Sequence, residues 1–438
     1  MAPDRHLRAR IVVNGGRRAV QLTVDRTWRR FGSTVLAGSP LRLFRLTPAG
    51  EAVAEAIERG DEVADSRLVD RLLDGGAAHP RWAGTAVYTV DDVTVVTPQL
   101  GGERHDDGRL TVDDATWPPL DGADVRFDVN RGPAAARNAA RPLVTTELVA
   151  FLDADVSASA GDRRRVWLTP LLAHFDDPRV GLVAPRVQGE SRSPLDLGVE
   201  PARIRAGSRV SYVPGAAIVV RVAALDSIGW FDERLRFGED VDLVWRLDQA
   251  GWRCRYEPTA SVWHQPRPTW RGRLAQHHGY GTSAAPLALR HPRALAPVRM
   301  NGWTASTWML LALGHPFAAV TLATASAAGL IGKLAGVPAG ESFALAMRGH
   351  LAAGEQLAMA IRRAWWPIVA AGALVSRRVR LVGVLALLAG GRSTPTDLAY
   401  ATGVWVGMLR TRTAAPITPA ISSWPARSRQ TTQPATDR

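Results

Sequence analysis

The chain has 438 residues, enough for two or three domains, and its 46% hydrophobic and 22% charged residues exclude disorder for most of the length. The net charge of +13 comes almost wholly from arginine, which suits an anionic partner: a nucleotide diphosphate, an acidic membrane face or a nucleic acid. The single cysteine, Cys254, excludes an intrachain disulfide. No apolar segment follows the basic N-terminal residues, so we expect no secretory signal and a location at the cytoplasmic face of the cell membrane or in the cytoplasm.

The first stretch, residues 1–84, has the pattern of a small α/β module. Thr47 precedes a proline, which predicts a capped helix start, and apolar residues continue at helical spacing until Gly60 ends the helix. A second short helix with one apolar face follows. Short β-like segments at 19–24 and 41–46 precede the first helix. We therefore predict a winged-helix-like domain.

Residues 85–292 change to short apolar runs that alternate with helical segments. Runs of this kind are expected of strands that are covered on both faces of an α/β sheet. In such sheets ligands bind beyond the carboxyl ends of the strands. The strands are expected at 93–96, 148–152 and 180–183, and the intervening helices at 134–141 and 167–175.

The C-terminal part, residues 293–415, is predicted to be hydrophobic, helical and membrane-associated, and 416–438 to be a disordered tail. Residues 303–330 contain no Asp, Glu, Lys or Arg, which is long enough for a membrane span. A helix pair packed on the protein is the alternative. Two shorter apolar runs, 365–375 and 381–388, have three arginines between them and suit an anionic lipid surface.

Asp153 and Asp155 directly follow the predicted strand that ends at Leu152. Alternation along an extended chain would place both side chains on the same side. Two neighbouring carboxylates repel each other unless a cation lies between them, and Mg²⁺ or Mn²⁺ prefers such oxygen ligands. A solvated acidic loop is the ordinary alternative. The preceding buried strand favours the metal site.

Glu239 and Asp240 open a second acidic cluster, at the start of a predicted helix whose later residues are apolar. Helix capping is the ordinary explanation of such acids. A carboxylate at this boundary is also placed to act as a general base on an acceptor hydroxyl.

His264 ends a further apolar run and would join a metal site only if its strand end lies beside Asp153 and Asp155. The segment from Asn130 to Asn138 is a turn that leads into a helix. Its helix N-terminus suits a phosphate, although a capped surface helix is the alternative.

Taken together and in order, these motifs resemble the inverting family 2 glycosyltransferases with the GT-A fold, over about 93–264. That family has a strand ending in paired aspartates, an N-x-G-x-x-x-A-R-N segment, a D-x-D strand end, a G-E-D helix and a strand ending in histidine. The corresponding positions here are Asp113 and Asp114, Asn130 to Asn138, Asp153 and Asp155, Glu239 and Asp240, and His264.

Longer phrases are similar to the glycosyltransferases of mycofactocin biosynthesis, among them SPLRLFRLTPAG, ELVAFLDADV, FGEDVDLVWRL and YGTSAAPLALRHP. This resemblance implies transfer of glucose from UDP-glucose to a peptide-derived redox cofactor. It also makes the first module similar to winged-helix domains that hold precursor peptides.

The resemblance assigns a role to each matching residue. Asp240, with Glu239 beside it, would be the catalytic base, and Asp153, Asp155 and His264 would hold the metal. Asp113 would contact the uridine. The remaining residues expected at the donor are Asn130, Gly132, Arg137, Asn138 and Asp153.

Two segments are shorter than the resemblance leads us to expect. Only 98–112 separate the first strand from Asp113, where the family has a crossover helix, and a second gap lies between Val187 and Ser193. A catalytically impaired homologue that binds peptides is therefore the alternative function. A nucleic-acid partner is not expected, because acids crowd the first two helices: Glu51, Glu55, Glu58, Asp61, Glu62, Asp65, Asp70 and Asp74.

Overall fold

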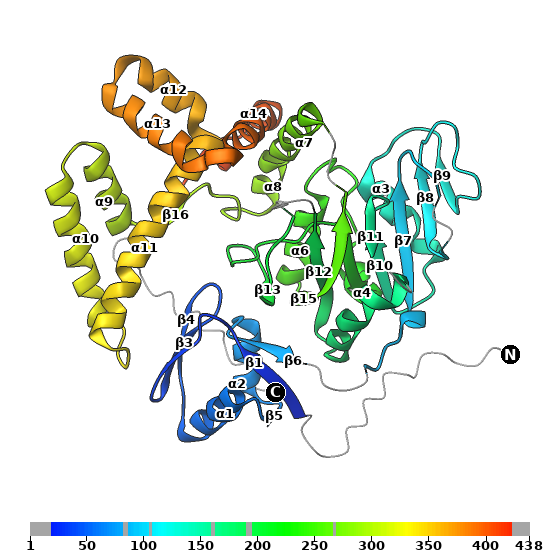
Figure 1. Cartoon of the computed structure of the whole chain (residues 1–438), viewed down its shortest axis with the longest axis horizontal. Coiled ribbons are helices and arrows are strands. Elements are labelled where there is room, and N and C mark those ends of the chain that lie inside the picture. The colour runs from blue at the N-terminus through cyan, green and yellow to red at the C-terminus, as the bar shows by residue number, and fades with distance from the viewer. Residues whose placement is uncertain are drawn as a thin grey trace, which may run out of the picture. The chain divides into compact units, whose positions relative to one another are not determined.

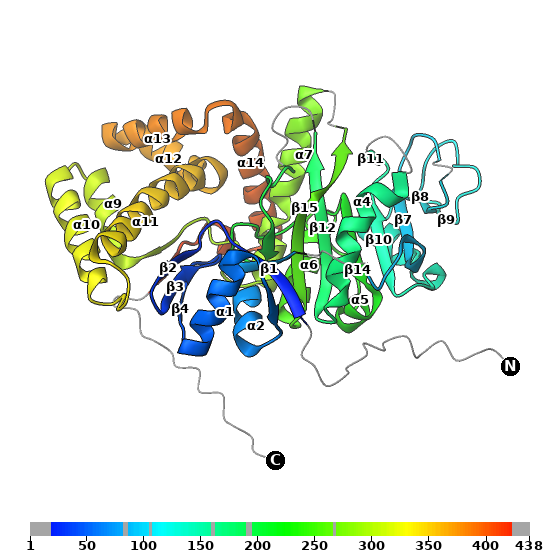
Figure 2. The same ribbon diagram turned by 60° about the horizontal axis from the view of Figure 1, so that its bottom comes forward.

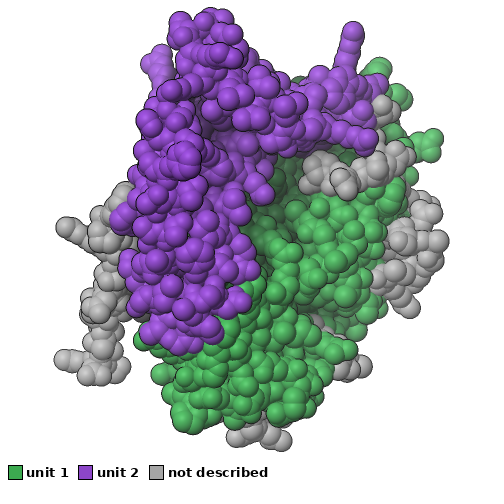
Figure 3. Space-filling view, turned by 60° about the vertical axis from the view of Figure 1, so that its left-hand side comes forward, with its two compact units in different colours: residues 1–266 green, residues 267–438 purple. Residues whose placement is uncertain are grey.

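The computed structural model divides the chain into two compact units, residues 1–266 and 267–438, each described here by itself (Figures 1 and 3). The end of the catalytic domain at residue 292 stays a prediction. The structure describes residues 19–81, 86–104, 107–158, 163–189, 195–265 and 269–422.

The N-terminal module of the first unit has its two helices where the sequence predicts them. The Thr47 side chain accepts a hydrogen bond from the Gly50 N–H (3.3 Å), and Gly60 ends the helix in the left-handed conformation (φ 81°). Ser66 caps the second helix in the same way. The elements are β1 (Ala19–Val24), β2 (Arg29–Phe31), β3 (Thr34–Ala37), β4 (Arg42–Arg45), α1 (Pro48–Arg59), β5 (Glu62–Ala64), α2 (Arg67–Asp74) and β6 (Ala78–Arg81).

These elements form two small sheets, ordered β5-β1-β6 and β2-β3-β4. Both sheets share one apolar core with the helices, built around Leu22, Val35, Ile57 and Leu72. The predicted strands at 19–24 and 41–46 are confirmed, whereas β2, β3, β5 and β6 were not predicted. The winged-helix name for this module stays a prediction.

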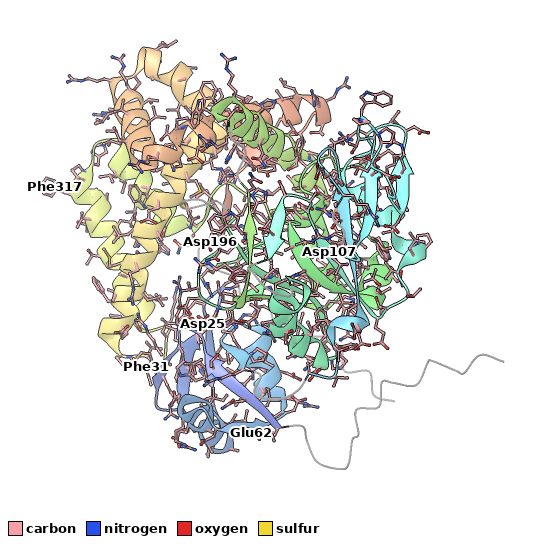
Figure 4. All side chains as sticks on the ribbon, turned by 45° about the vertical axis from the view of Figure 1, so that its right-hand side comes forward. Asp25, Phe31, Glu62, Asp107, Asp196 and Phe317 are labelled. Atoms are coloured by element: carbon pink, nitrogen blue, oxygen red, sulfur yellow. The ribbon has the colours of Figure 1, made fainter. Side chains whose placement is uncertain are left out.

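Ion pairs join the module to the rest of the first unit. The buried Arg253 guanidinium donates to Asp74 (2.7 Å) and Asp70 (3.0 Å) of α2, and also to Asp177 (2.7 Å) of the sheet domain. A further pair lies within the module, between Asp25, labelled in Figure 4, and the buried His79. Because a buried guanidinium without its carboxylates is costly, this contact fixes the module on the sheet domain.

The remainder of the first unit is a mixed nine-stranded sheet flanked by helices (Figure 2). Its order is β11-β15-β12-β14-β10-β7-β8-β9, with β13 pairing β15. The strands are β7 (Val93–Gln99), β8 (Leu110–Asp114), β9 (Val125–Phe127), β10 (Leu148–Leu152), β11 (Val156–Ala158), β12 (Val180–Gln188), β13 (Ala202–Ile204), β14 (Ala217–Arg221) and β15 (Arg253–His264). The helices are α3 (Pro133–Ala139), α4 (Arg163–Leu172), α5 (Val222–Ile228) and α6 (Glu239–Gln249).

Strand direction decides where the functional residues meet. β10, β7, β8 and β9 are parallel, and β14 runs antiparallel between β10 and β12. β12 is parallel to β15, so both of these strands again run in the direction of β10. The carboxyl ends of β7, β8, β10, β12 and β15 therefore lie at one edge of the sheet, as the sequence interpretation requires.

The predicted strands and helices of this domain are confirmed, and β10 is buried throughout. The expectation of an extended chain through Asp153 and Asp155 is wrong. The Val156 N–H donates to the Asp153 carbonyl (3.1 Å), which closes a turn directly after β10. The second predicted gap, between Val187 and Ser193, lies largely outside the described residues.

The second unit is helical, with one two-stranded parallel contact between β16 (Arg299–Asn301) and β17 (Ala420–Ser422). Helices α7 and α14 approach closely, because a Cβ on Gly281 or Gly403 would fall 1.9 Å from a backbone oxygen of the other helix. The helices are α7 (Trp270–Thr282), α8 (Ala284–Arg290), α9 (Gly302–Ala312), α10 (Pro316–Ile331), α11 (Ala339–Ala360), α12 (Trp366–Val375), α13 (Arg377–Gly390) and α14 (Thr394–Thr411).

The charge-free run at 303–330 forms the helix pair α9 and α10 instead of one long helix. Gly314 in the left-handed conformation (φ 82°) and Pro316 at the start of α10 divide it. Among the described residues, no helix combines the length and apolar character that a membrane crossing requires. The run is a helix pair, which the sequence analysis gives as the alternative to a membrane span.

Candidate active site

The predicted site residues gather at the carboxyl edge of the sheet. Asp153 follows β10, and its N–H donates to the Ala216 carbonyl (2.9 Å) of the neighbouring segment before β14. His264 ends β15 opposite Val156 of β11. Arg137 of α3 and Glu239 of α6 contact each other across this edge. Residues far apart in the sequence therefore meet in one place.

Arg137 is the centre of this arrangement and is only 2% exposed. Its Nη1 donates to Glu239 Oε1 (2.9 Å), and its Nη2 donates to Asp153 Oδ1 (2.8 Å) and to the Gly215 carbonyl (3.3 Å). The guanidinium also lies 5.3 Å from the centre of the Phe231 ring. Burial lowers the pKa of Arg137, but the Asp153 and Glu239 carboxylates raise it further, so the cation persists. The sequence predicted Arg137 at the donor; the structure makes it the counter-ion of two site carboxylates.

Asp240 is held by two backbone donors. Its Oδ2 accepts from the Gly215 N–H (3.0 Å) and its Oδ1 from the Val241 N–H (2.8 Å). Burial raises the pKa of Asp240, while these backbone hydrogen bonds oppose the rise. A carboxylate has about four acceptor positions, so two hydrogen bonds leave room for an acceptor hydroxyl. The side chain is thus fixed in orientation and made more basic, as a general base requires.

Glu239 lies beside Asp240 and is 8% exposed. Burial, and then the negative charge of Asp240, raises the pKa of Glu239 to about 7, although Arg137 opposes this. Two carboxylates at the start of one helix therefore have different surroundings. Glu239 binds the buried arginine, whereas Asp240 accepts hydrogen bonds from the backbone N–H groups of Gly215 and Val241.

Asp155 and His264 form a second pair, with 3.3 Å between His264 Nε2 and Asp155 Oδ2. The Gln265 N–H also donates to the Asp155 carbonyl (3.1 Å), which ties the two chain segments together. Asp155 is exposed and His264 is largely covered. Carboxylate oxygen and imidazole nitrogen are suitable ligands for Mn²⁺, and oxygen suits Mg²⁺.

No three His, Cys, Asp or Glu side chains converge into a ready metal site within the part of the chain that the structure describes. Asp153, the third predicted ligand, is turned to Arg137. The chain therefore offers an adjacent carboxylate and imidazole to a metal, and further ligands would come from elsewhere.

Asp113 is where the sequence places it, at the end of β8 and in register with Gln99 of β7. The short connection therefore still allows a parallel strand. Its carboxylate is fully buried, pairs with Arg126, and accepts from the Thr116 (2.8 Å) and Leu120 (3.2 Å) N–H groups. Burial raises the pKa of Asp113, but the hydrogen bonds from Thr116 and Leu120 and the Arg126 charge lower it more. In this geometry Asp113 orders its own loop; its contact with uridine stays a prediction.

Asp114 organises the predicted phosphate-facing turn. Its carboxylate accepts from the N–H groups of Arg131 (2.6 Å) and Gly132 (2.8 Å) and from the Asn130 side chain (3.0 Å). Gly132 has a φ of 94°, which favours glycine, and it starts α3. Asn130 and Gly132 thus position the helix that carries Arg137.

Asn138 lies at the other end of α3 and points to a different loop. Its side chain donates to the Phe231 carbonyl (2.9 Å) and accepts from the Phe231 N–H (3.1 Å). Through these bonds Asn138 positions Phe231, whose ring contacts Arg137. A direct role of Asn138 at the donor stays a prediction.

Sequence reasoning did not single out Gly215 or Phe231. Gly215 contacts both Arg137 and Asp240, and a Cβ there would lie 3.2 Å from Arg137 Nη2 and 3.3 Å from Asp240 Cβ. The Pro214-Gly215 dipeptide was the available signal, since such a pair marks a turn. Nothing in the spacing of Phe231 showed its contact with Arg137.

Two family models match the chain. The model described as "Glycosyltransferase like family 2" matches residues 86–279, and that described as "Glycosyl transferase family group 2" matches residues 199–375. The first match covers the sheet and all the site residues described above.

Curated relatives extend the similarity to nearly the whole chain. The pre-mycofactocin glycosyltransferase of Mycobacterium tuberculosis is 38% identical over 469 aligned residues, which cover 91% of this chain and 97% of the relative. Because 91% of 438 residues is about 399, about 70 aligned positions have no residue in this chain. The relative therefore has segments that this chain lacks. The succinoglycan biosynthesis protein ExoU of Rhizobium meliloti is 33% identical and covers 43% of this chain and 55% of that protein.

Among solved structures, the mannosyltransferase PcManGT from Pyrobaculum calidifontis, in complex with GDP-Man and Mn²⁺, is similar with a TM-score of 0.42 and 17% identity. The match covers 73% of this chain and 87% of that one.

Proposed function

The chain belongs to the family 2 glycosyltransferases, in the group of the pre-mycofactocin glycosyltransferase, and its first unit has the mixed α/β sheet of the GT-A class. From this premise we propose that it transfers glucose from UDP-glucose to the peptide-derived redox cofactor mycofactocin, or to its growing oligosaccharide. We further propose an inverting, metal-dependent reaction.

Asp240 is the proposed base. Its carboxylate accepts the proton of an acceptor hydroxyl while that oxygen bonds to the anomeric carbon of glucose. The bond from this carbon to the phosphate oxygen breaks, and UDP leaves with the electron pair. A single displacement of this kind inverts the anomeric configuration. The hydrogen bonds from Gly215 and Val241 hold Asp240 in one orientation before the acceptor arrives.

Asp155 and His264 would hold Mg²⁺ or Mn²⁺ together with oxygens of the donor diphosphate. When bound, the cation would neutralise the charge that develops on the leaving diphosphate. Arg137 holds the Asp153 carboxylate (2.8 Å), which interacts electrostatically with both Asp155 and His264. The chain's own contribution is therefore a pre-arranged set of charges at the edge of the sheet.

The N-terminal module is the proposed holder of the peptide part of the acceptor. Arg253 and its three aspartate partners fix the module to the domain that carries the active site. The alignment with the pre-mycofactocin glycosyltransferase spans 91% of the chain, so most of the module is shared with that relative. An acceptor held there would stay tethered during successive transfers.

One observation carries the proposal: Arg137 joins Asp153, Glu239 and the Gly215 segment, and Gly215 in turn holds Asp240. This network connects the donor side of the site to the proposed base. The test measures glucosyl transfer and donor affinity for the wild type and for Asp240→Asn. We expect transfer to fall by about 10³-fold or more with donor affinity nearly unchanged, because the amide cannot accept the proton.

An equal loss of transfer and donor affinity in Asp240→Asn would show that Asp240 supports the site without acting as a base. Donor and peptide binding without transfer by the wild type would favour the alternative, a catalytically impaired peptide-binding homologue.

A further inference from the structure

Positive charge is distributed unequally between the two units. Residues 267–438 contain 19 Lys and Arg but only 4 Asp and Glu, a formal charge of +15. Since the whole chain has +13, residues 1–266 carry −2. The net positive charge of the protein therefore comes entirely from residues 267–438.

The turn between α9 and α10 exposes apolar side chains. Residues 311–318 are all exposed, and Phe317, labelled in Figure 4, is 89% exposed and points away from the helices. Leu313 in the turn and Val320 in the next helical turn are 47% and 65% exposed. An aromatic side chain at a helix-hairpin tip has no partner to bury it within the described part of this unit.

The hairpin of α12 and α13 has the same character. Leu374 and Val375 at its turn are 82% and 90% exposed, and Leu381 on the next turn of helix is 59% exposed. Helix α12 contains no charged residue, and none of its residues is buried. Arg377 and Arg380 lie at the start of α13, directly beside these apolar side chains.

A direct contact joins the two turns. Arg378 Nη1 donates to the Leu313 carbonyl (2.5 Å), and its guanidinium lies beside Gly314. Arg380 donates back to the Ala373 carbonyl (3.2 Å), which closes the α12 end. The exposed side chains thus form one surface within the second unit, the apolar turn surface: Leu313, Phe317, Val320, Leu374, Val375 and Leu381.

We infer that this surface inserts into an anionic lipid bilayer and holds the chain peripherally at the membrane, on its cytoplasmic face. Contiguous exposed apolar side chains mark interaction surfaces, and Phe and Leu at such tips enter the boundary between headgroups and acyl chains. Arg377 and Arg380 would meet acidic headgroups, and the +15 charge would add long-range attraction.

The lipid surface is favoured over a protein or nucleic-acid partner by two features together. The apolar side chains lie on helix-hairpin tips, which suits shallow insertion, whereas phosphate contacts of nucleic acids need clustered basic groups without apolar tips. The bordering charged residues are arginines, and the few acids of this unit in the described range, Glu341, Glu355 and Asp397, lie on other helices.

The test is co-sedimentation of the full chain with vesicles of neutral phosphatidylcholine, with or without about 30% phosphatidylglycerol. We expect binding to the anionic vesicles that weakens as salt rises. The variant Phe317→Ser/Leu374→Ser/Val375→Ser should bind about 1000-fold more weakly, because each of the three buried apolar side chains accounts for about tenfold. Arg377→Gln/Arg380→Gln should lose the preference for anionic vesicles.

The matched control is Val87→Ser/Val199→Ser, which removes two equally exposed apolar side chains (66% and 65%) from the first unit and should bind as the wild type does. Unchanged vesicle binding of the triple variant would overturn the inference. The inference would also be overturned if the wild type did not bind vesicles and was a dimer, while the triple variant was a monomer. The surface would then bind a second copy of the chain. Vesicle binding needs no donor or acceptor, so this test is separate from that of glucosyl transfer.

Discussion

At the scale of single residues, the carboxylates of the site could be predicted from the sequence, but the groups that each carboxylate contacts could not. Paired acids after a buried strand and at a helix start indicate the site directly. The sequence does not show that Glu239 contacts Arg137 at 2.9 Å while Asp240 accepts hydrogen bonds from backbone N–H groups. Those contacts depend on how α3, α6 and the Gly215 segment come together.

For Asp113, the sequence predicts the position in the fold but not the contacts of the side chain. The resemblance assigns it to uridine, and the structure confirms its place at the end of β8. Its partners Arg126, Thr116 and Leu120 belong to the loop that follows, and no motif spacing indicated them. Local loop geometry therefore decides what a correctly placed residue contacts.

The pH dependence of transfer follows from the acid pair. Asp240 must be ionised to accept a proton and burial raises its pKa, so kcat/KM should fall as pH falls through that raised pKa. The charge of ionised Asp240 helps to raise the pKa of Glu239 to about 7, so Glu239 is still neutral at the pH where Asp240 ionises. Glu239→Gln keeps this neutral form, so the acid limb of the kcat/KM profile should stay in place.

Glu233→Gln is the control, because Glu233 is exposed and pairs with Arg131 at the surface. Its profile should match that of the wild type. A clear shift of the acid limb in Glu239→Gln would show that Glu239 is already ionised when Asp240 titrates, which would contradict this order of ionisation.

At the scale of elements, the short apolar runs predicted the buried strands well, because a strand covered on both faces has a distinctive composition. Thr47 and Gly60 likewise fixed the ends of α1. The sequence did not give the antiparallel place of β14 between β10 and β12, which depends on long-range pairing. The turn after β10 was also missed: aspartate favours turns, but the D-x-D motif was interpreted as an extended chain at a metal site.

Arg137 ties three elements together, α3, the end of β10 and the start of α6, and its replacement tests that role. Arg137→Met should lower the free energy of unfolding by about 3–5 kcal/mol, because it leaves the Asp153 and Glu239 carboxylates without their cation. The free energy of unfolding of Arg137→Lys should lie between those of the wild type and Arg137→Met. An ammonium group keeps the charge but cannot donate to both carboxylates as the planar guanidinium does. Urea unfolding of each variant measures the difference.

The control for this series is Arg141→Met, which removes an exposed ion pair with Asp226. A surface pair of this kind contributes about 0–1 kcal/mol. Equal effects of the Arg137 and Arg141 substitutions would contradict the assignment of Arg137 as the buried link between the elements.

At the scale of the whole molecule, the order of the parts could be predicted, but the form of the helical unit could not. A charge-free run of 28 residues satisfies the length of a membrane span, and only the bend at Gly314 and Pro316 separates that reading from a helix pair. The sequence signals were glycine and proline, whose effect depends on the packing of neighbouring helices.

Two acidic residues of the N-terminal module have a role that only the folded structure shows. Asp70 and Asp74 bind Arg253 of the sheet domain, so part of the acidic composition of this region joins the two domains. The module, the catalytic sheet and the basic helical unit thus provide, in the proposed account, an acceptor holder, a site of transfer and a membrane contact.

Calorimetric titration of UDP-glucose into the full chain, with and without Mn²⁺, tests the central claim of a working donor site most directly. The account predicts binding that requires the cation and that weakens at least about tenfold in Asp155→Ala, because this carboxylate is a proposed metal ligand. Absence of binding under both conditions, or binding that neither Mn²⁺ nor the Asp155 substitution changes, would contradict it.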